Sequence, residues 1–385
     1  MDFVTSFKNN GAFLEIKGDS GITNDYYVEF IDLNTNKTEY STLIRVNHWT
    51  TIPSENEKNW LIRVTLDNQL VFERRKEEKF DGVFIKITSS SLGDTIGWIP
   101  YVEEYRKVNS VKVMISTYHN YLFEKVYPYL IFIDKDVSLD SINNVDKKFK
   151  IDHYPLNFNQ IDDKKYDNIK NVDYRTEKLQ FIASNILGLP NEEIIPKIDI
   201  PKDNVPKIGG KYVVVAIQST AQCKYWNNPF GWERLFDFLK RNGYKVVLID
   251  KYKIYGTVGH FNQAPKSKNI IDKTGNYSIS DRIIDIKHAS MFIGLSSGLA
   301  WLAWTVGTPV IMISGFTKPW YEFSNNYRIH KDDVCNGCWN DVDIKFDNSN
   351  WMFCPRNRGF ICSKAILPKD VTDVVKKVIQ KKEVK

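Results

Sequence analysis

The chain has 385 residues, of which 42% are hydrophobic and 26% are charged, and its formal net charge is +6. These fractions are ordinary for a folded globular protein, and they exclude a disordered chain and a collagen-like one. The charge is small for this length, so it does not indicate a nucleic-acid binder, although a mild basic excess can favour an anionic substrate. At roughly 100–200 residues per domain, the length predicts two or three domains.

The sequence contains no apolar run that approaches the roughly 20 residues needed by a membrane-spanning helix. Its first residues lack a basic segment followed by an apolar core, so we do not expect a signal peptide. We therefore expect a cytoplasmic protein. The five cysteines of such a chain do not predict a disulfide framework.

The first part of the chain, residues 1–80, is rich in short strand-like runs. Stretches of β-branched and aromatic residues such as DYYVEFIDL and NWLIRVTL are separated by turn signals such as NTNK and IPSENEK. No helical pattern interrupts them. This spacing predicts a small β-sheet or barrel-like module.

Residues 81–205 follow a different pattern, in which strands alternate with helical segments. The strands are GVFIKITS, VKVMIST and LIFID, and the segments between them are TIGWIPYVEEYRK and YLFEKVYPYL. A further helix is expected over TEKLQFIASNILG, before a stretch rich in Pro and charge that resembles an interdomain linker. Strand–helix–strand repetition predicts a parallel α/β sheet.

A second α/β series occupies residues 206–385. Its expected strands are KYVVVAIQS, KVVLID, NIIDKTG, MFIGLSS and TPVIMIS, and its expected helices are WERLFDFLKRNGY, SISDRIIDIKHA, GLAWLAWTVG and DVTDVVKKVIQKK. Ser280 or Asp281 is the expected N-cap of the second helix. The whole chain thus predicts a β module followed by two doubly wound, Rossmann-like halves. Such halves bind ligands at the carboxyl ends of their strands.

The first strand-to-helix turn of the α/β part contains Gly93, Asp94 and Thr95. A glycine there lets the backbone approach a ligand, and the N-terminus of the following helix favours an anion. Asp94 has two interpretations that do not exclude each other. It is either the N-cap of the helix, a position that favours Asp, or a general base that faces the cleft.

The turn after KYVVVAIQS contains Ser219, Thr220 and Lys224. Small hydroxyl groups and a lysine at a strand end suit a phosphate, and the lysine charge can offset charge that develops on a diphosphate leaving group. The alternative is a solvated loop lysine, which is the commoner situation for an isolated lysine.

The turn after MFIGL contains Ser296, Ser297 and Gly298 and opens a helix. Hydroxyl groups and free N–H groups at a helix N-terminus form an anion site. The alternative is a capping serine beside a glycine that permits tight packing.

Four of the five cysteines lie within residues 335–362, in the spacing C-x2-C-x15-C-x7-C; they are Cys335, Cys338, Cys354 and Cys362. Four thiolates with this spacing fit a tetrahedral all-sulfur site for zinc or iron. The alternative is four unrelated buried thiols. A site whose four ligands are all protein thiolates has no open position, so it is structural rather than catalytic.

No Walker A, G-x-G-x-x-G or H-E-x-x-H motif occurs in the sequence. Their absence argues against NTPases, dehydrogenases of the common dinucleotide-binding type and zincins.

Four segments together resemble the bacterial autotransporter heptosyltransferases, a branch of the glycosyltransferases that includes the lipopolysaccharide heptosyltransferases of glycosyltransferase family 9. They are SLGDTIGWIPYVEEYRK, KYWNNPFGWERLFDFL, FIGLSSGLAWLAWTVGTPVIMISGFTKPWYEF and VCNGCWNDVDIKFD. The resemblance runs from about residue 80 to about residue 367. It implies a GT-B fold and an inverting, metal-independent transfer of heptose from ADP-heptose to serine hydroxyls on an autotransporter adhesin.

The resemblance also implies roles for individual residues. Asp94 would be the catalytic base, and Lys224 would steady the phosphates of the donor. The four cysteines would form an iron finger, so iron is favoured over zinc, and the chain would assemble into large homo-oligomers.

The chain departs from the lipopolysaccharide enzymes at Ser296-Ser297-Gly298, where those enzymes carry Asp-Thr-Gly, so the sugar contact of that Asp does not carry over. Three alternatives stay open. They are a lipopolysaccharide-core-type heptosyltransferase with a saccharide acceptor, a transferase for a different nucleotide sugar, and a non-enzymatic scaffold of the same fold.

Overall fold

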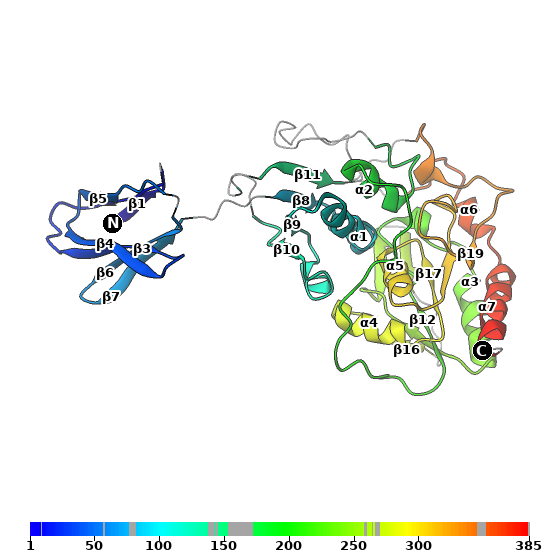
Figure 1. The fold of residues 1–385 in the computed structure, drawn as a ribbon. Helices are drawn as coiled ribbons and strands as arrows, with labels where there is room; N and C mark the ends of the chain where they lie inside the picture. Colours follow the sequence, from blue (N-terminus) through cyan, green and yellow to red (C-terminus); the bar gives the residue numbers. More distant parts are fainter. Residues whose placement is uncertain are drawn as a thin grey trace. The chain divides into compact units, whose positions relative to one another are not determined.

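The computed structural model spans residues 1–385 and describes all of them except 9, 57, 77–81, 138–141, 143–144, 153–171, 258–259, 264, 266–269, 345–351 and 384–385. The chain divides into two compact units, Met1–Phe80 and Asp81–Lys385 (Figure 1).

Within its described residues, the first unit consists of strands in two antiparallel sheets, with the orders β1-β2-β5 and β4-β3-β6-β7. The strands are β1 (Asp2–Ser6), β2 (Ala12–Lys17), β3 (Tyr26–Asp32), β4 (Lys37–Ile44), β5 (His48–Ile52), β6 (Trp60–Leu66) and β7 (Gln69–Arg75). Alternate residues point inward, so that Leu14, Ile16, Val28 and Phe30 pack against Trp60 in one core. The predicted short strands are confirmed, whereas closure into a barrel stays a prediction.

The second unit begins with a parallel four-stranded sheet of order β10-β9-β8-β11. Its elements are β8 (Val83–Ile87), α1 (Leu92–Asn109), β9 (Val113–Ser116), β10 (Leu130–Ile133), β11 (Lys147–Ile151) and α2 (Leu179–Leu187). The sheet grows in one direction from β8 to β10, and β11 then pairs with the other side of β8. This reversal puts a topological switch point beside β8, the strand that leads to Asp94.

The helix expected over YLFEKVYPYL is wrong. The chain forms only a 3₁₀ turn there, Asn120–Leu122, between β9 and β10. Pro128 explains the difference, because proline has no N–H to donate and disfavours a helical conformation at the preceding residue, Tyr127. Apolar side chains of this segment are nevertheless buried in the core.

A second parallel sheet, of six strands, has the order β16-β13-β12-β17-β18-β19. Its strands are β12 (Tyr212–Val215), β13 (Lys245–Leu248), β16 (Ile270–Asp272), β17 (Phe292–Leu295), β18 (Val310–Ile313) and β19 (Arg328–Ile329). The associated helices are α3 (Gly231–Arg241), α4 (Ile279–Lys287), α5 (Gly298–Thr305), α6 (Ile361–Lys364) and α7 (Pro368–Glu383), and a hairpin forms from β14 (Ile254–Thr257) and β15 (His260–Gln263). In chain order the sheet reads 3-2-1-4-5-6, the order of a doubly wound nucleotide-binding fold.

The two faces of this sheet pack against different helices. Val213 and Val215 of β12 lie in a core with residues of α3 and α7, which Figure 1 shows on the same side of the sheet. Val214 lies in the opposite core, which contains residues of α1, α2, α4 and α5. Because α1 and α2 belong to the first sheet, one continuous core joins the two halves.

The N-cap of helix α4 lies two or three residues earlier in the chain than expected. Its N-cap is Ser278, not Ser280 or Asp281. The Ser278 hydroxyl accepts a hydrogen bond from the Asp281 backbone N at 3.1 Å and donates to the Asp281 carboxylate at 2.7 Å. The pair is a reciprocal cap in which Asp281 occupies the third helical position.

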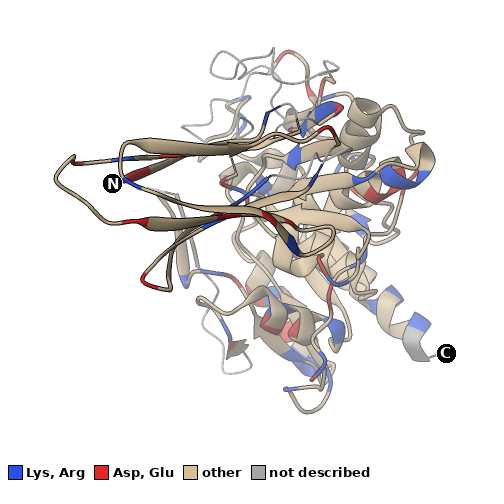
Figure 2. Cartoon of the chain, turned by 60° about the vertical axis from the view of Figure 1, so that its left-hand side comes forward, with Lys and Arg blue, Asp and Glu red and all other residues tan. Residues whose placement is uncertain are grey.

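Figure 2 shows basic and acidic residues interspersed over both units, in agreement with 53 basic and 47 acidic residues in the sequence. The charges that bear on a bound ligand are therefore those within its site.

None of the helices that the structure describes has the length and apolar character to cross a membrane.

Candidate functional site

A cavity of about 910 Å³ lies at the carboxyl ends of the parallel strands of the second unit. Its lining residues include Ser89, Ser90, Ser91, Gly93 and Asp94 after β8, Ser219, Thr220 and Lys224 after β12, Asp250 and Lys251 after β13, and Ser296, Ser297 and Gly298 after β17. Doubly wound sheets bind ligands at this edge because the strand order reverses there and leaves a crevice. The volume is within the range of small-molecule and cofactor sites.

The structure brings together the three turns that the sequence indicated, although the first and the last of them are more than 200 positions apart in the chain. Thr95 is the exception among the predicted residues. It is fully buried and its hydroxyl donates to the Ser91 carbonyl oxygen at 3.2 Å, so it stabilises the first turn of α1 and does not line the cavity.

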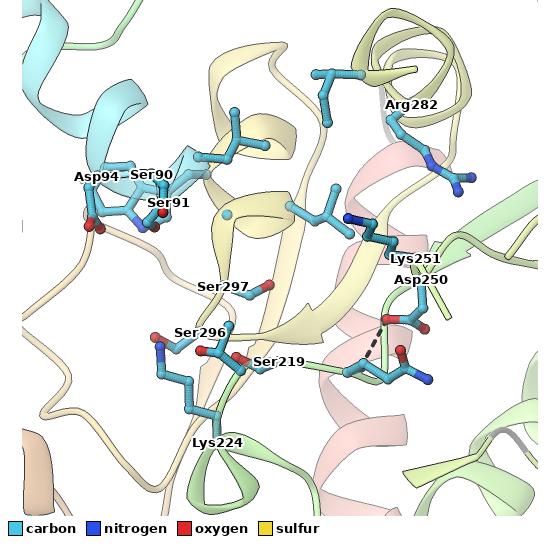
Figure 3. Close-up of a pocket in the computed structure, with 18 of the residues that line it drawn as sticks. Ser90, Ser91, Asp94, Ser219, Lys224, Asp250, Lys251, Arg282, Ser296 and Ser297 are labelled. Carbon is cyan, nitrogen blue, oxygen red and sulfur yellow. Dashed lines mark hydrogen bonds between the residues drawn. The ribbon is translucent and has the colours of Figure 1, made fainter. Parts of the chain in front are cut away.

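Asp94 is not the N-cap of α1, because the helix begins at Leu92 after the N-cap Ser91. Its carboxylate lies in the first turn, where the helix dipole stabilises negative charge, and it accepts a hydrogen bond from the Ser89 hydroxyl at 2.5 Å. Figure 3 shows Asp94, Ser90 and Ser91 on one side of the cavity and Asp250, Lys251 and Arg282 on the other. The cap interpretation is wrong, and the carboxylate lies at the cavity wall.

The N-terminus of α5 also lines the cavity. Ser297 is its N-cap, but its side chain makes no capping hydrogen bond. The Ser297 Oγ is buried and has no hydrogen-bond partner. Together with the first free N–H groups of α5, this hydroxyl can donate to an anionic ligand group.

Lys224 ends a 3₁₀ turn, Gln222–Lys224, that follows β12. Its ammonium group lies 5.8 Å from the centroid of the Phe316 ring, a cation–π distance. Strands β12 and β17 are neighbours in the sheet, so the Lys224 turn and the Ser296-Ser297-Gly298 turn leave the sheet at the same edge. Lys224 and the anion site that the sequence predicts at Ser296-Ser297-Gly298 therefore belong to the same wall of the cavity.

Sequence reasoning missed a buried acidic residue behind this wall, Glu322. It is 2% exposed, lines the cavity, and pairs with Arg328 at 2.5 Å. Its carboxylate also accepts hydrogen bonds from the hydroxyls of Ser296 and Thr317. Glu322 lies in an irregular segment between β18 and β19, where no periodic pattern marks a buried position.

Asp250 and Arg282 were also missed. The Asp250 carboxylate accepts hydrogen bonds from the backbone N of Ile217 and of Gln218, both at 2.9 Å, and burial raises its pKa to about 6. The Arg282 guanidinium lies 4.7 Å from the centroid of the Tyr277 ring, and burial lowers its pKa. An acidic residue directly after KVVLI in a doubly wound pattern was the available signal for Asp250.

None of the four clustered cysteines is among the residues that line the cavity. Cys338 and Cys362 are buried. Burial raises the pKa of Cys338 to about 11. The pKa of Cys362 is raised to about 12, mainly by burial and to a smaller extent by the neighbouring thiols. Within the part of the chain that the structure describes, no group of three or more His, Cys, Asp or Glu side chains is arranged to hold a metal ion.

Comparisons with known proteins agree with this architecture. The family model of glycosyltransferase family 9 (heptosyltransferase) matches residues 145–341. The chain is 30% identical over 378 residues to the autotransporter heptosyltransferase Aah of Escherichia coli, covering 96% of this chain and 91% of that protein.

Two solved structures of another relative, TibC, cover nearly the whole chain. The crystal structure of the "bacterial iron-containing dodecameric glycosyltransferase TibC" from enterotoxigenic E. coli has a TM-score of 0.70 and 28% identity, and covers 99% of this chain and 96% of that one. The second is a complex of TibC with ADP-D-beta-D-heptose, with a TM-score of 0.69 and 28% identity, covering 98% of this chain and 96% of that one.

A third relative is described as inactive. The inactive autotransporter heptosyltransferase BimC of Burkholderia thailandensis is 27% identical over 83% of this chain and 74% of its own length.

The family match over half of the chain and the similarity to Aah over nearly the whole chain settle family membership. The chain belongs to glycosyltransferase family 9, the heptosyltransferases, in the branch of the autotransporter heptosyltransferases.

Proposed function

We propose that this protein transfers heptose from ADP-heptose to serine hydroxyls of an autotransporter adhesin, with inversion at the anomeric carbon. The observation that carries the proposal is the cavity, which is lined by Asp94 from one Rossmann-like half and by Lys224 and the N-terminus of α5 from the other. The TibC complex with ADP-heptose supports this donor, and the similarity to Aah supports an autotransporter acceptor.

The proposed reaction is a single displacement. The Asp94 carboxylate takes the proton of the acceptor hydroxyl, and the hydroxyl oxygen forms a bond to the anomeric carbon. The bond between that carbon and the phosphate oxygen breaks, and its electron pair leaves with ADP. Lys224, Ser297 and the N–H groups at the start of α5 supply the positive charge and hydrogen-bond donors that a diphosphate leaving group requires.

Gly93, Ser219 and Thr220 complete the proposed substrate site. Gly93 lies in the first turn of α1 and lines the cavity beside Asp94. Ser219 and Thr220 add hydroxyl groups to the wall that carries Lys224.

A non-enzymatic scaffold is the second candidate, because one relative is described as inactive. Asp94 and Lys224 favour the enzyme, since both charged groups line one cavity. A lipopolysaccharide-type acceptor has less support, because the relatives that match most of this chain are autotransporter heptosyltransferases.

We also propose that Cys335, Cys338, Cys354 and Cys362 hold iron in a structural site, as the iron-containing TibC suggests. The donor set fits this metal chemically, because four free cysteine thiols can bind it as thiolates. Bound iron would brace residues 335–362 and take no part in the transfer. We also propose that the chain forms a homo-oligomer, because the relative TibC is dodecameric. The cytoplasmic location and the closed N-terminal barrel stay predictions.

Intact-mass measurement of an autotransporter passenger domain co-expressed with this protein tests the function. The expected result is a series of species that differ by the mass of one heptose residue. Co-expression with Asp94→Asn should yield the unmodified mass. An unmodified passenger domain beside folded wild-type protein, together with no binding of ADP-heptose, would favour the scaffold.

A further inference from the structure

Two helices of the second unit begin with the same sequence pattern, in which a serine N-cap precedes an aspartate by three positions. The pattern is Ser91–Asp94 in α1 and Ser278–Asp281 in α4. This is the spacing of a capping box, in which the N-cap and the third helical residue satisfy each other's polar groups. The same local signal therefore predicts the same local structure at both helix N-termini.

The two helices differ in the outcome. In α4 the Ser278 hydroxyl donates to the Asp281 carboxylate at 2.7 Å and accepts from the Asp281 backbone N at 3.1 Å. In α1 the side chain of the N-cap Ser91 makes no capping hydrogen bond. The Asp94 carboxylate accepts a hydrogen bond at 2.5 Å from the hydroxyl of Ser89, which lies two residues before the N-cap. A serine outside the helix thus holds the aspartate that the box would have used.

The Ser89 hydroxyl lies between the Asp94 carboxylate and the backbone of the N-cap. Its Oγ accepts a hydrogen bond from the Ser91 backbone N at 3.1 Å, and this N–H is the group that the third residue of a capping box would bind. A backbone N–H can only donate, and a hydroxyl has a single proton. The Ser89 proton is therefore directed to Asp94, and the N–H that could attract the carboxylate is already satisfied.

The turn that carries Ser89 is fixed to the strands on both sides of β8. The Thr88 hydroxyl donates to the Asp152 carboxylate, which follows β11, at 2.6 Å. The ring Nε2 of His119, which follows β9, lies 3.1 Å from the Ser90 carbonyl oxygen. Both β9 and β11 pair with β8. Removal of one hydroxyl from this turn should therefore leave its backbone in place.

A general base must face the acceptor hydroxyl and not its own helix. A carboxylate bound within a capping box has its lone pairs directed at the helix terminus, whereas Asp94 lines the cavity. We infer that Ser89 is a positioning residue that keeps the Asp94 carboxylate out of the capping box and at the cavity wall, where it receives the proton of the acceptor hydroxyl. The inference rests on the proposed function, and Ser89 acts in it only through Asp94.

Steady-state kinetics and donor titration of the full-length Ser89→Ala protein test the inference. Without the hydroxyl, the Ser91 N–H becomes available to Asp94 and the box can close. We expect kcat for heptose transfer to fall roughly tenfold to a hundredfold, as for a misplacement of about 1 Å, while the Kd for ADP-heptose changes less than about twofold. Ser89→Thr, which retains the hydroxyl, should restore kcat to within a few fold of the wild type.

A double-mutant cycle separates positioning from a general effect on the fold. In Asp94→Asn there is no base to position, so the addition of Ser89→Ala should lower the residual rate, measured with enzyme in excess, by less than about twofold. A purely structural role of Ser89 would lower both rates by the same factor. Ser54→Ala is the control, because it removes a hydroxyl that donates to a backbone carbonyl oxygen in the first unit; its kcat should equal that of the wild type.

A crystal structure of Ser89→Ala shows the displacement directly. The Asp94 carboxylate should lie within hydrogen-bond distance of the Ser91 backbone N, about 2.7–3.2 Å. The midpoint of thermal unfolding should stay close to that of the wild type, because the closed box replaces the lost hydrogen bond at the start of α1.

The possible outcomes separate the inference from the proposed function. Wild-type kcat in Ser89→Ala, equal losses in both backgrounds of the cycle, or an unmoved Asp94 carboxylate would each reject the inference and leave the proposed function intact. A wild-type protein that binds ADP-heptose but transfers no heptose to the passenger domain would reject the proposed function. The structure of Ser89→Ala would then still decide whether Ser89 holds Asp94 out of the capping box.

Discussion

Gly93 of α1 and Gly298 of α5 lie so close together that neither position has room for a side chain without movement of the other helix. A Cβ on Gly93 would lie 3.3 Å from the Cα of Gly298, and a Cβ on Gly298 would lie 3.1 Å from the backbone N of Gly93. The two helix N-termini belong to different Rossmann-like halves. Their contact therefore sets the separation between Asp94 on one half and the Ser297 hydroxyl on the other.

We expect Gly298→Ala to reduce transfer more than it reduces stability. The added methyl group should cost roughly 1–3 kcal/mol of unfolding free energy, as is usual for overpacking. It should also shift the two helix N-termini apart, and a misplacement of about 1 Å can lower a rate on the order of a hundredfold. Thermal unfolding and initial transfer rates, measured on the same preparation, give both quantities.

Gly209→Ala is the matched control for this glycine substitution, because nothing lies within 4 Å of a Cβ at Gly209. It should leave both stability and rate close to the wild type. A Gly298→Ala protein with a wild-type rate would show that the close approach is a packing feature without influence on the site.

Asp94→Asn should abolish most of the transfer and spare donor binding. Asparagine is nearly isosteric and its carbonyl oxygen can still accept the Ser89 hydrogen bond, but it cannot take a proton from the acceptor hydroxyl. Loss of a general base typically lowers the rate by roughly 10²–10⁴-fold. Single-turnover kinetics and titration with ADP-heptose measure the two effects separately, and a rate within a few fold of the wild type would refute the assignment of Asp94 as the base.

The parts of the site that could be predicted from sequence are those that follow directly from a strand. Asp94, Lys224 and Ser296 each follow an apolar run that ends in small residues, and parallel strands bring such turns to one edge. Element type followed from the same runs, except where Pro128 prevented the expected helix. Ser278, Ser280 and Asp281 are all good capping residues, so composition alone could not choose between them.

The parts that could not be predicted depend on contacts across the fold. Glu322 reaches Ser296 and Arg328 only because β18 and β19 are adjacent in the sheet. The short β19 has no strand signature of its own.

Lys224→Ala should weaken the binding of ADP-heptose and of ADP alike, because the lysine is proposed to contact the shared diphosphate. A hydrogen bond to a charged group contributes about 1.5–3 kcal/mol, which corresponds to a loss of roughly tenfold to a hundredfold in affinity. Lys240→Ala, an exposed lysine in the last turn of α3, is the control of equal charge. Unchanged titration curves for Lys224→Ala would remove this residue from the donor site.

Replacement of Cys335 and Cys338 by serine should release the metal from the purified protein and lower the thermal stability of the second unit. Two of four thiolates are lost, and structural metal binding contributes directly to folding free energy. Elemental mass spectrometry gives the iron and zinc content per chain. Cys223→Ala, a buried cysteine outside residues 335–362, should keep the metal; equal metal content in both variants would contradict the four-cysteine assignment.

Asp250 should give the second unit a pH dependence opposite to that of carboxylates that are paired with cations. Burial raises its folded-state pKa to about 6 from an ordinary value of 3.8, so between these values the folded state holds a proton that the unfolded state has released. The unfolding free energy due to Asp250 is then largest below about pH 4, falls as the pH rises towards 6, and is constant above that, with a total change on the order of 2–3 kcal/mol.

Other carboxylates titrate in the same range, so the informative quantity is the difference in unfolding free energy between the wild type and Asp250→Asn. Urea unfolding of both proteins from pH 4 to pH 8 should show that the wild type loses stability relative to Asp250→Asn as the pH rises, and that the difference becomes constant above about pH 6. A difference that is independent of pH would mean that the hydrogen bonds from Ile217 and Gln218 hold the Asp250 carboxylate ionised throughout, since they act against the effect of burial.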